Sequence, residues 1–208
     1  VGGKAQGARG VMRRLYSPLF LIETPVLFTS LETAELIKYA CNSFLATKIT
    51  FINAMADLCE KVGADVHDVA RGIGLDGRIG RKFLHPGPGY GGSCFPKDTA
   101  ALVRTAREYG APQTIVETVI EANRTRKLAM IDKIVDVCDG SVAGKTIAVL
   151  GVTFKPNTDD MRDAPALVIL PALIEAGARL KAHDPEGMAH ARREIDGVAW
   201  CDCAYSAM

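Results

Sequence analysis

A glycine-rich loop places a cysteine just ahead of a predicted helix. The stretch "GPGYGGSCFPKD", residues 87 to 98, carries Cys94 two residues before Pro96, and proline suits the first turn of a helix. The helix dipole and Lys97 both favour a thiolate, which would make Cys94 a nucleophile. Asp98 could then position a water or handle a proton, and the glycines would let the backbone approach a ligand closely. A Gly/Pro connector with an incidental cysteine explains the stretch equally well on chemistry alone.

A second pair of polar side chains lies on one face of a predicted helix. Lys38 and Asn42 are four residues apart and therefore point the same way, beside a stripe of apolar residues. A cation and an amide on one face can hold a polar substrate or a developing oxyanion. From the residues alone, the favoured interpretation is that Lys38 extends its charge to solvent and that Asn42 is a surface asparagine.

A third polar stretch, "GVTFKPNTDDMRD", follows a predicted strand. Open α/β sheets bind ligands at the carboxyl ends of their strands, so Lys155 and Arg162 could contact phosphates there. The stretch lacks G-x-G-x-x-G, so it is not a dinucleotide fingerprint. A solvated charge run is the alternative. Asp184 ends the next strand, where a ribose-binding carboxylate can sit, but a plain Asp-Pro turn is favoured.

The composition is that of an ordinary globular protein. The 208 residues carry 25 basic and 24 acidic side chains, so nothing draws the chain to nucleic acid or to a membrane surface. No apolar run approaches the roughly 18 residues of a membrane helix. Six scattered cysteines predict a reducing, cytoplasmic compartment rather than a disulfide scaffold. Cys201 and Cys203 lack a zinc-site spacing, and no metal site is predicted.

The elements that must position these residues fall into two types. Residues 29 to 138 have helical spacing throughout, and the first helix runs about 30 residues from a possible capping box, Thr29 with Glu32, to Gly63. A helix of that length suggests a central scaffold at a subunit interface. Three shorter helices are predicted after it, at about residues 65–72, from Pro96 to Gly110, and from Pro112 to about Cys138.

The pattern changes after Gly144. "KTIAVLGVTF" is typical of a buried parallel strand. Alternating elements follow: a helix at "APALVILPALIEAG", a strand at "RLKAHDP", a helix near 188 to 194 and a short strand at "VAW". The predicted fold class is therefore α/β multidomain, with an all-helical central domain followed by a partial Rossmann-like, doubly wound parallel sheet.

Four stretches together resemble the UDP-glucose 6-dehydrogenase family of nucleotide-sugar dehydrogenases. They occur in the family's order within about residues 1 to 185, and they are "TAELIKYACNSFLATKITFIN", "GADVHDVARGIGLDGRIGRKFL", "GPGYGGSCFPKD" and "GVTFKPNTDDMRD". The resemblance implies an NAD-dependent four-electron oxidation of UDP-glucose to UDP-glucuronate through a cysteine thiohemiacetal and thioester. "DGRIG" and "GYGGSCFPKD" look more like the UDP-glucose branch than the GDP-mannose or UDP-N-acetylmannosamine branches.

The resemblance also implies a role for each polar residue. Cys94 is the nucleophile, Lys38 and Asn42 stabilise or relay protons at the reacting oxygen, and Asp98 serves hydrolysis through water. Which of Lys38 and Asp98 acts as base at each step stays open. The residues implied in substrate binding are Lys38, Asn42, Arg78 (from a neighbouring subunit), His85, Pro86, Gly87, Pro88, Gly89, Tyr90, Gly91 and Lys155. Those implied near NAD are Cys94, Lys97 and Arg162.

The resemblance divides the chain into three parts. Residues 1–28 are expected to be the tail of an NAD-binding domain and a linker, residues 29–138 the central helical domain, and residues 139–208 part of a UDP-sugar-binding domain. The Rossmann domain with which family members begin is not among them, so the 208 residues alone are expected to be inactive. The expected partners are UDP-glucose, NAD and a second copy of the chain. The alternatives are a dehydrogenase of GDP-mannose or of a UDP-N-acetylhexosamine, or a non-catalytic dimerisation module.

Overall fold

The computed structural model describes residues 1–3, 5–19 and 25–208. They form two compact units, Val1–Asn42 and Ser43–Met208. Among the helices of these described residues, none is long and apolar enough to cross a lipid bilayer. Within the same ranges, no group of three or more His, Cys, Asp or Glu side chains is placed to hold a metal ion.

The first unit contains two short helical segments and the beginning of a long helix: α1 (Gln6–Tyr16), η1 (Ser17–Leu19) and α2 (Leu31–Val62). The cap of α2 is Ser30, whose Oγ accepts the N–H of Thr33 at 3.1 Å. The predicted capping box at Thr29 is therefore wrong by one position. Thr29 is instead paired through its backbone, because its N–H donates to the carbonyl of Val1 and its carbonyl accepts the N–H of Gly3.

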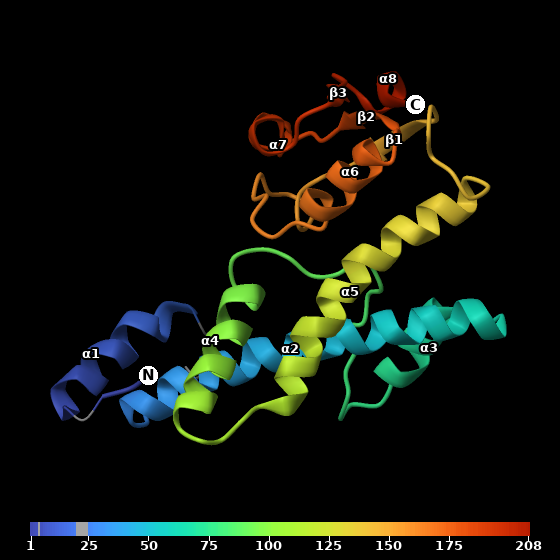
Figure 1. The fold of residues 1–208 in the computed structure, drawn as a ribbon. Coiled ribbons are helices and arrows are strands. Elements are labelled where there is room, and N and C mark those ends of the chain that lie inside the picture. The colour runs from blue at the N-terminus through green and yellow to red at the C-terminus, as the bar shows by residue number, and fades with distance from the viewer. Residues whose placement is uncertain (4, 20–24) are drawn as a thin grey trace. The chain divides into compact units, whose positions relative to one another are not determined.

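The second unit opens with the rest of α2 and three more helices: α3 (Val66–Gly74), α4 (Phe95–Glu108) and α5 (Thr114–Val137). The predicted end of the long helix is confirmed, since α2 stops at Val62 and Gly63 follows with φ of +72°. Irregular backbone from residue 75 to 94 separates α3 from α4. In Figure 1, α5 runs from beside α4, past the second half of α2, to α6 of the sheet region.

The carboxyl-terminal part alternates strands and helices as predicted: β1 (Thr146–Leu150), α6 (Ala166–Glu175), β2 (Arg179–His183), α7 (Met188–Glu194), β3 (Val198–Trp200) and α8 (Ala204–Ala207). The three strands are parallel in the order β1-β2-β3, with Thr146 opposite Arg179 and Leu180 opposite Val198. Two details differ from the prediction. β1 ends at Leu150 because Gly151 turns the chain with φ of +86°, and β1 is an edge strand of the described sheet, with Leu150 exposed rather than buried.

The main hydrophobic core lies between the sheet and α6. It contains the fully buried Leu173 and Leu180, together with Val142 and Val152. Residues of the second half of α5 pack against this core: Met130, Ile131, Ile134 and Val135. α5 therefore belongs to both regions, since its first half contacts α4 and its second half is built into the core of the sheet region.

Candidate active site

Cys94 stands at the start of α4, where sequence analysis expected a helix. It is the residue immediately before the first helical residue, Phe95, and its side chain is exposed. The Cys94 carbonyl accepts the N–H of Asp98 at 2.9 Å, and the Ser93 Oγ lies 3.8 Å from the Cys94 sulfur. An exposed thiol at a helix N-terminus is accessible to a bound substrate and lies at the positive end of the helix dipole.

Asp98 lies one helical turn after Cys94 and is buried, with 4% of its surface exposed. The Lys97 ammonium is 3.4 Å from the Asp98 Oδ1 and is itself largely exposed. A buried carboxylate beside a cation, one turn from an exposed thiol, is a suitable arrangement for handling water or a proton near the sulfur.

The loop of residues 83–94, here called the cysteine loop, is held by side chains from two helices. Asn53 of α2 accepts the Gly87 N–H at 2.8 Å, and Arg126 of α5 donates through Nε to the Gly87 carbonyl at 2.9 Å. Asn123 of α5 makes both bonds to Tyr90, accepting its N–H at 2.8 Å and donating to its carbonyl at 3.1 Å. The main-chain groups of Gly87 and Tyr90 thus have partners within the protein.

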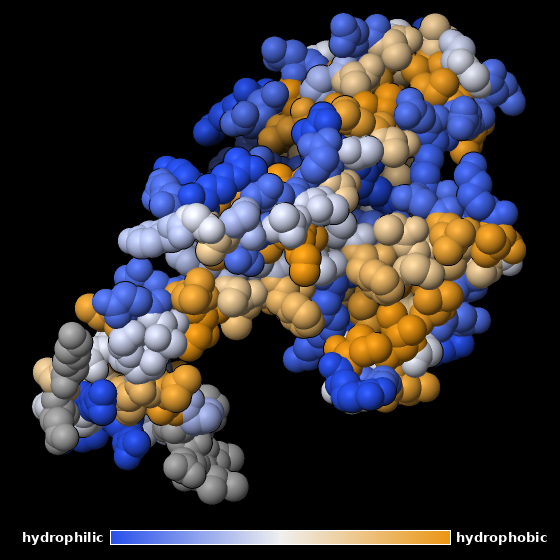
Figure 2. Space-filling model, turned by 60° about the horizontal axis from the view of Figure 1, so that its bottom comes forward, coloured by the Kyte–Doolittle hydropathy of each residue, from blue (hydrophilic) through white to orange (hydrophobic). Residues whose placement is uncertain are grey.

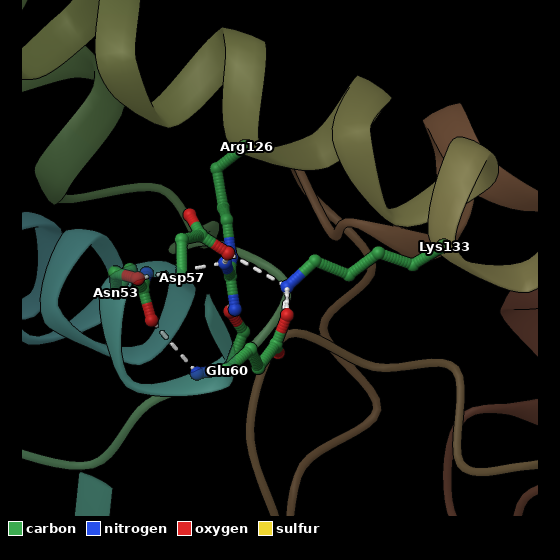
Figure 3. Close-up of polar contacts among 6 residues, drawn as sticks. Asn53, Asp57, Glu60, Arg126 and Lys133 are labelled. Carbon is green, nitrogen blue, oxygen red and sulfur yellow. Dashed lines mark hydrogen bonds and ion pairs between the residues drawn. The ribbon is translucent and has the colours of Figure 1, made fainter. Parts of the chain in front are cut away.

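A chain of charges supports the Arg126 side chain (Figure 3). Arg126 bonds to the Asp57 carboxylate of α2, Lys133 donates to Asp57 at 2.6 Å, and Lys133 also bonds to Glu60 at 2.7 Å. Partial burial raises the pKa of Asp57, but the hydrogen bonds and charges of Lys133 and Arg126 outweigh it, so the pKa is lowered overall. The charge of the buried Arg126 guanidinium is therefore balanced by the Asp57 carboxylate of α2.

Aromatic packing connects the cysteine loop to the start of α4. The Tyr90 ring meets the Phe95 ring edge-on with centroids 5.9 Å apart, and the Phe83 ring lies 6.1 Å from Phe95 on a tilt. Burial raises the pKa of the Tyr90 hydroxyl, and its hydrogen bond with Thr99 opposes that shift only in part. Phe95, which follows Cys94, is thus packed against Tyr90, which Asn123 holds through its backbone.

The polar loop, residues 151–163, lies against the cysteine loop. The Gly92 N–H donates to the Arg162 carbonyl at 2.7 Å. The Arg162 guanidinium bonds to Asp160 through Nε at 2.9 Å and Nη2 at 2.7 Å. These bonds lower the pKa of Asp160 to about 2. The pKa of Arg162 is raised, chiefly by Asp160 and to a smaller extent by the nearby Cys94.

Two glycines of the cysteine loop lie in close contact with the polar loop. A Cβ on Gly91 would lie 2.3 Å from the Asp163 carbonyl oxygen, and a Cβ on Gly92 would lie 2.7 Å from the Phe154 ring. Both glycines therefore permit close contact with the polar loop, and close approach of the loop backbone to a ligand stays a prediction. Gly87, in contrast, has open space where a Cβ would be.

Asp184 takes the plain structural role that sequence analysis favoured. Its carboxylate accepts four backbone N–H groups, from Val152, Thr153, Glu186 and Gly187. Burial raises its pKa, but these bonds outweigh burial and lower it overall. The carboxylate thereby fixes the start of the polar loop and the turn before α7.

The remaining predicted residues lie at several places. Lys38 and Asn42 are on α2 in the first unit, Lys38 exposed and Asn42 buried. Arg78 is exposed and paired with Asp76, and Lys155 is exposed with its ammonium 5.1 Å from the centre of the Phe154 ring. His85 is exposed and lines a groove of about 430 Å³ beside α3. Pro86, Pro88 and Gly89 lie in the cysteine loop as expected.

Comparison with known families identifies this architecture. Residues 32–125 match the central domain of the UDP-glucose/GDP-mannose dehydrogenase family, and residues 148–208 match the UDP binding domain of the same family. The chain belongs to this family. The family match supports the expected family and adds nothing in favour of a non-catalytic dimerisation module.

Individual relatives agree with the family match. The chain is 60% identical over 204 residues to a UDP-glucose 6-dehydrogenase of Rhizobium meliloti, covering 98% of the chain and 46% of the relative. It is 50% identical to the UDP-glucose 6-dehydrogenase TuaD of Bacillus subtilis, covering all of the chain and 44% of the relative. A solved UDP-glucose dehydrogenase from Pyrobaculum islandicum superimposes with a TM-score of 0.91 at 35% identity, over 99% of this chain and 47% of that one. The chain thus spans about half the length of these relatives.

Sequence reasoning missed the residues that hold the loops, namely Asn53, Asn123, Arg126 and Lys127. Asn123 and Lys127 lie in a helical pattern and are buried polar residues, and Lys127 donates to the Asp163 carbonyl at 2.9 Å. Their periodicity was compatible with an ordinary helix face. The only sequence signal was a polar residue at a position that the helical spacing assigns to the buried side.

Proposed function

We propose that the protein is an NAD-dependent UDP-glucose 6-dehydrogenase, which oxidises UDP-glucose to UDP-glucuronate by four electrons. The observation that carries the proposal is the exposed Cys94 at the N-terminus of α4, with the buried Asp98 one turn later. The relatives from Rhizobium meliloti and Bacillus subtilis, which bear this enzyme's name, support the choice of substrate. Because the chain spans about half of those relatives, the proposal concerns the whole protein.

Cys94 explains how one site can carry two oxidations. The Cys94 sulfur adds to the carbonyl carbon of the C6 aldehyde, a C–S bond forms, and the oxygen takes up a proton to give a thiohemiacetal. Loss of a hydride from that carbon, with transfer of the hydroxyl proton to a nearby base, leaves a thioester. Water then adds to the thioester carbon, the C–S bond breaks, and the carboxylate is released with the Cys94 thiolate restored.

The other polar residues would manage charge and protons. Asp98 is placed to orient the water that attacks the thioester, since it lies one turn from the sulfur. Lys38 and Asn42 would stabilise the charge that develops on the C6 oxygen or relay its proton. Both lie on α2, four residues apart, which places their side chains on one side of that helix.

The cations near Cys94 fit an anionic dinucleotide. Lys97 and Arg162 are both exposed, and the nearby Cys94 makes a small contribution to the raised pKa of Arg162. We assign Cys94, Lys97 and Arg162 to the NAD side of the site, where the two cations would face its phosphates. NAD, when bound, would accept a hydride in each oxidation.

The substrate would lie along the cysteine loop. We assign the segment from His85 to Gly91 to the nucleotide sugar, with Lys155 of the polar loop binding it from the UDP binding domain. Arg78 would reach it from a neighbouring subunit. The main-chain groups of Gly87 and Tyr90 are already bonded within the protein, so their contribution would come from the shape of the loop.

Replacing the nucleophile tests the proposal. In the full-length protein, Cys94→Ser should lower UDP-glucuronate formation by at least about a thousandfold, because a serine hydroxyl is a far weaker nucleophile than a thiolate. Product is measured by chromatography with UDP-glucose and NAD, and with GDP-mannose in a parallel reaction. The control is Cys203→Ser, which removes another exposed cysteine and should leave turnover unchanged. Equal product from Cys94→Ser and wild type would remove the nucleophile assignment.

The 208 residues by themselves should reduce no NAD. They span about half of the relatives and match only the central and UDP binding domains of the family. The measurement is absorbance at the NADH wavelength after mixing the purified chain with UDP-glucose and NAD. NADH production above the enzyme-free rate would contradict this part of the proposal.

A homodimer through α2 is also proposed. Phe44, Phe51 and Leu58 are exposed at intervals of seven residues and so follow one face of the helix, with Val62 beside them at 65% exposure. Figure 2 shows that hydrophobic areas remain on the surface of the protein. Phe51→Glu should shift the full-length protein toward monomer in analytical ultracentrifugation, whereas Tyr109→Glu, at an exposed aromatic residue after α4, should not.

A cytoplasmic location is proposed as well. A catalytic thiolate must stay reduced, and the cytoplasm keeps thiols reduced. The six cysteines of the chain are all free in the structure.

A further inference from the structure

The first half of α5 presents two buried polar side chains on one face. Asn123 and Lys127 are four residues apart, and both lie more than nine-tenths buried. Each is directed at backbone of a different loop. Asn123 holds the Tyr90 peptide groups of the cysteine loop, and Lys127 donates to the Asp163 carbonyl of the polar loop at 2.9 Å.

The Asp163 carbonyl is enclosed from two sides. Lys127 bonds it from α5, and Gly91 approaches it so closely that a Cβ there would be 2.3 Å from the oxygen. Asp163 itself has φ of +51°, a left-handed conformation that is uncommon for residues other than glycine. The hydrogen bond from Lys127 therefore stabilises an unusual backbone conformation at the point where the two loops touch.

Both loops carry a residue of the proposed site within a short distance of these contacts. Arg162 precedes Asp163, and its carbonyl accepts the Gly92 N–H. Tyr90 packs on Phe95, which follows Cys94. A shift of Lys127 would thus reach Arg162 through Asp163. A shift of Asn123 would reach Cys94 through Tyr90 and Phe95.

We propose that Asn123 and Lys127 are positioning residues that hold the cysteine loop and the polar loop in one fixed arrangement. Neither residue touches a reacting atom. Burial lowers the pKa of Lys127, opposed by the charge of Asp163, which fits an ammonium enclosed between protein segments. The inference rests on the proposed function, because the arrangement matters for catalysis only if Arg162 binds NAD and Cys94 is the nucleophile.

The test compares two lysines that both donate to a backbone carbonyl. Lys127→Met keeps most of the buried aliphatic volume and removes the donor, and Lys127→Arg restores a donor. Lys145→Met is the matched control, since Lys145 bonds the Cys138 carbonyl at the end of α5, outside the site. Each variant is made in the full-length protein and measured for melting temperature, for turnover, for the KM of NAD and for the alkylation rate of Cys94 by iodoacetamide.

Lys127→Met should lower turnover roughly ten- to a hundredfold, because displacements near 1 Å at a reacting centre have effects of that size. It should raise the KM of NAD and change the Cys94 alkylation rate several-fold, and Lys127→Arg should recover part of each. Lys145→Met should stay within about twofold of wild type in all three. If Lys127→Met stays as close to wild type as Lys145→Met does, the proposal is overturned.

A double-mutant cycle separates positioning from general stabilisation. If Lys127 acts through the polar loop, Lys127→Met should raise the KM of NAD much less in an Arg162→Met background than in wild type. Full additivity of the two effects would contradict the proposal. Failure of the wild-type protein to oxidise UDP-glucose would instead overturn the proposed function, and the Cys94 alkylation rates would still report on positioning.

Asn123 provides an independent arm of the same test. Asn123→Asp keeps the acceptor for the Tyr90 N–H and loses the donor to the Tyr90 carbonyl, so it should change the Cys94 alkylation rate less than Asn123→Ala does. Equal alkylation rates in wild type and Asn123→Ala would remove Asn123 from the proposal.

Discussion

The cysteine loop and the polar loop touch each other but are held in different ways. The cysteine loop is bonded by Asn53, Asn123 and Arg126, which lie 33 to 39 positions away along the chain. The polar loop is held largely from within, by the pairing of Asp160 with Arg162 and by the Thr153 hydroxyl on the Lys155 carbonyl. Its distant supports include Asp184, which accepts the Val152 N–H, and Lys127, which donates to the Asp163 carbonyl at the end of the loop.

The difference concerns when and how each loop can acquire its shape. Bonds between close neighbours can form before the fold is complete, because they cost little loop-closure entropy. The cysteine loop can take its shape only after α2 and α5 have come together. The nucleophile therefore lies in the loop that depends most on the completed fold, and this dependence can be measured at single residues.

The largest effect is expected where the two loops touch. Gly91→Ala places a Cβ 2.3 Å from the Asp163 carbonyl oxygen, a backbone atom that cannot move aside alone. It should lower the free energy of unfolding by about 3 kcal/mol or more, measured by urea titration. Gly87→Ala, where a Cβ meets open space, should change it by no more than about 0.5 kcal/mol. Equal losses at the two positions would show that the contact between the loops is not tight.

The support that Asp184 gives to the polar loop comes next in size. Asp184→Ala leaves four backbone N–H groups without their acceptor and should destabilise the protein by about 2–3 kcal/mol. Asp159→Ala, an exposed aspartate of the same loop, should stay within about 0.5 kcal/mol. A small effect of Asp184→Ala in thermal or urea unfolding would mean that the polar loop keeps its shape without Asp184.

One of the supports of the cysteine loop can be removed alone. Asn53→Ala leaves the Gly87 N–H without its acceptor and should cost about 1–2 kcal/mol. Hydrogen exchange should show the Gly87 amide losing protection, while the Gly92 amide, which is bonded to Arg162, keeps it. Loss of protection at both amides would indicate that the two loops open together.

The smallest effect concerns pH and the internal pairing of the polar loop. The Asp160 pKa is lowered from 3.8 to about 2 in the folded protein. A carboxylate with a lowered folded pKa stabilises the fold above its unfolded pKa, and the contribution is lost as the pH falls through the folded pKa. The stability difference between wild type and Asp160→Asn should therefore shrink between about pH 4 and pH 2. A difference that stays constant across that interval would show that Arg162 does not hold Asp160.

Local signals predicted most of the fold. The end of α2 followed from Gly63, the start of α4 from Pro96, and the short strand at residues 198–200 from its β-branched and aromatic residues. The errors were also local. The helix cap was predicted at Thr29, whose backbone is paired with Val1 and Gly3, and it lies one residue later at Ser30. β1 was predicted too long because an apolar run continues beyond the turn at Gly151.

The candidate site could be predicted only in part. Cys94 was identified because glycines, a helix start and a cation lie within a few positions of it. Asn123 and Lys127 act on backbone more than 30 positions away, and no local pattern indicates which loop a helix face will meet. The contact of Gly91 with Asp163 was not predicted for the same reason, since a sequence shows that space is needed there and not which atom occupies it.

The contact of Gly91 and Lys127 with Asp163 has a consequence for exchanging parts between relatives. It crosses the boundary predicted between residues 138 and 139, so a chimera joined there would combine a glycine and a lysine from one parent with a carbonyl conformation from the other. Residues 91 to 163 form the smallest block that keeps the contact intact. A chimera joined inside that block has to take Gly91, Lys127 and Asp163 from the same parent. The segment must therefore be exchanged as a whole, although it spans two family domains.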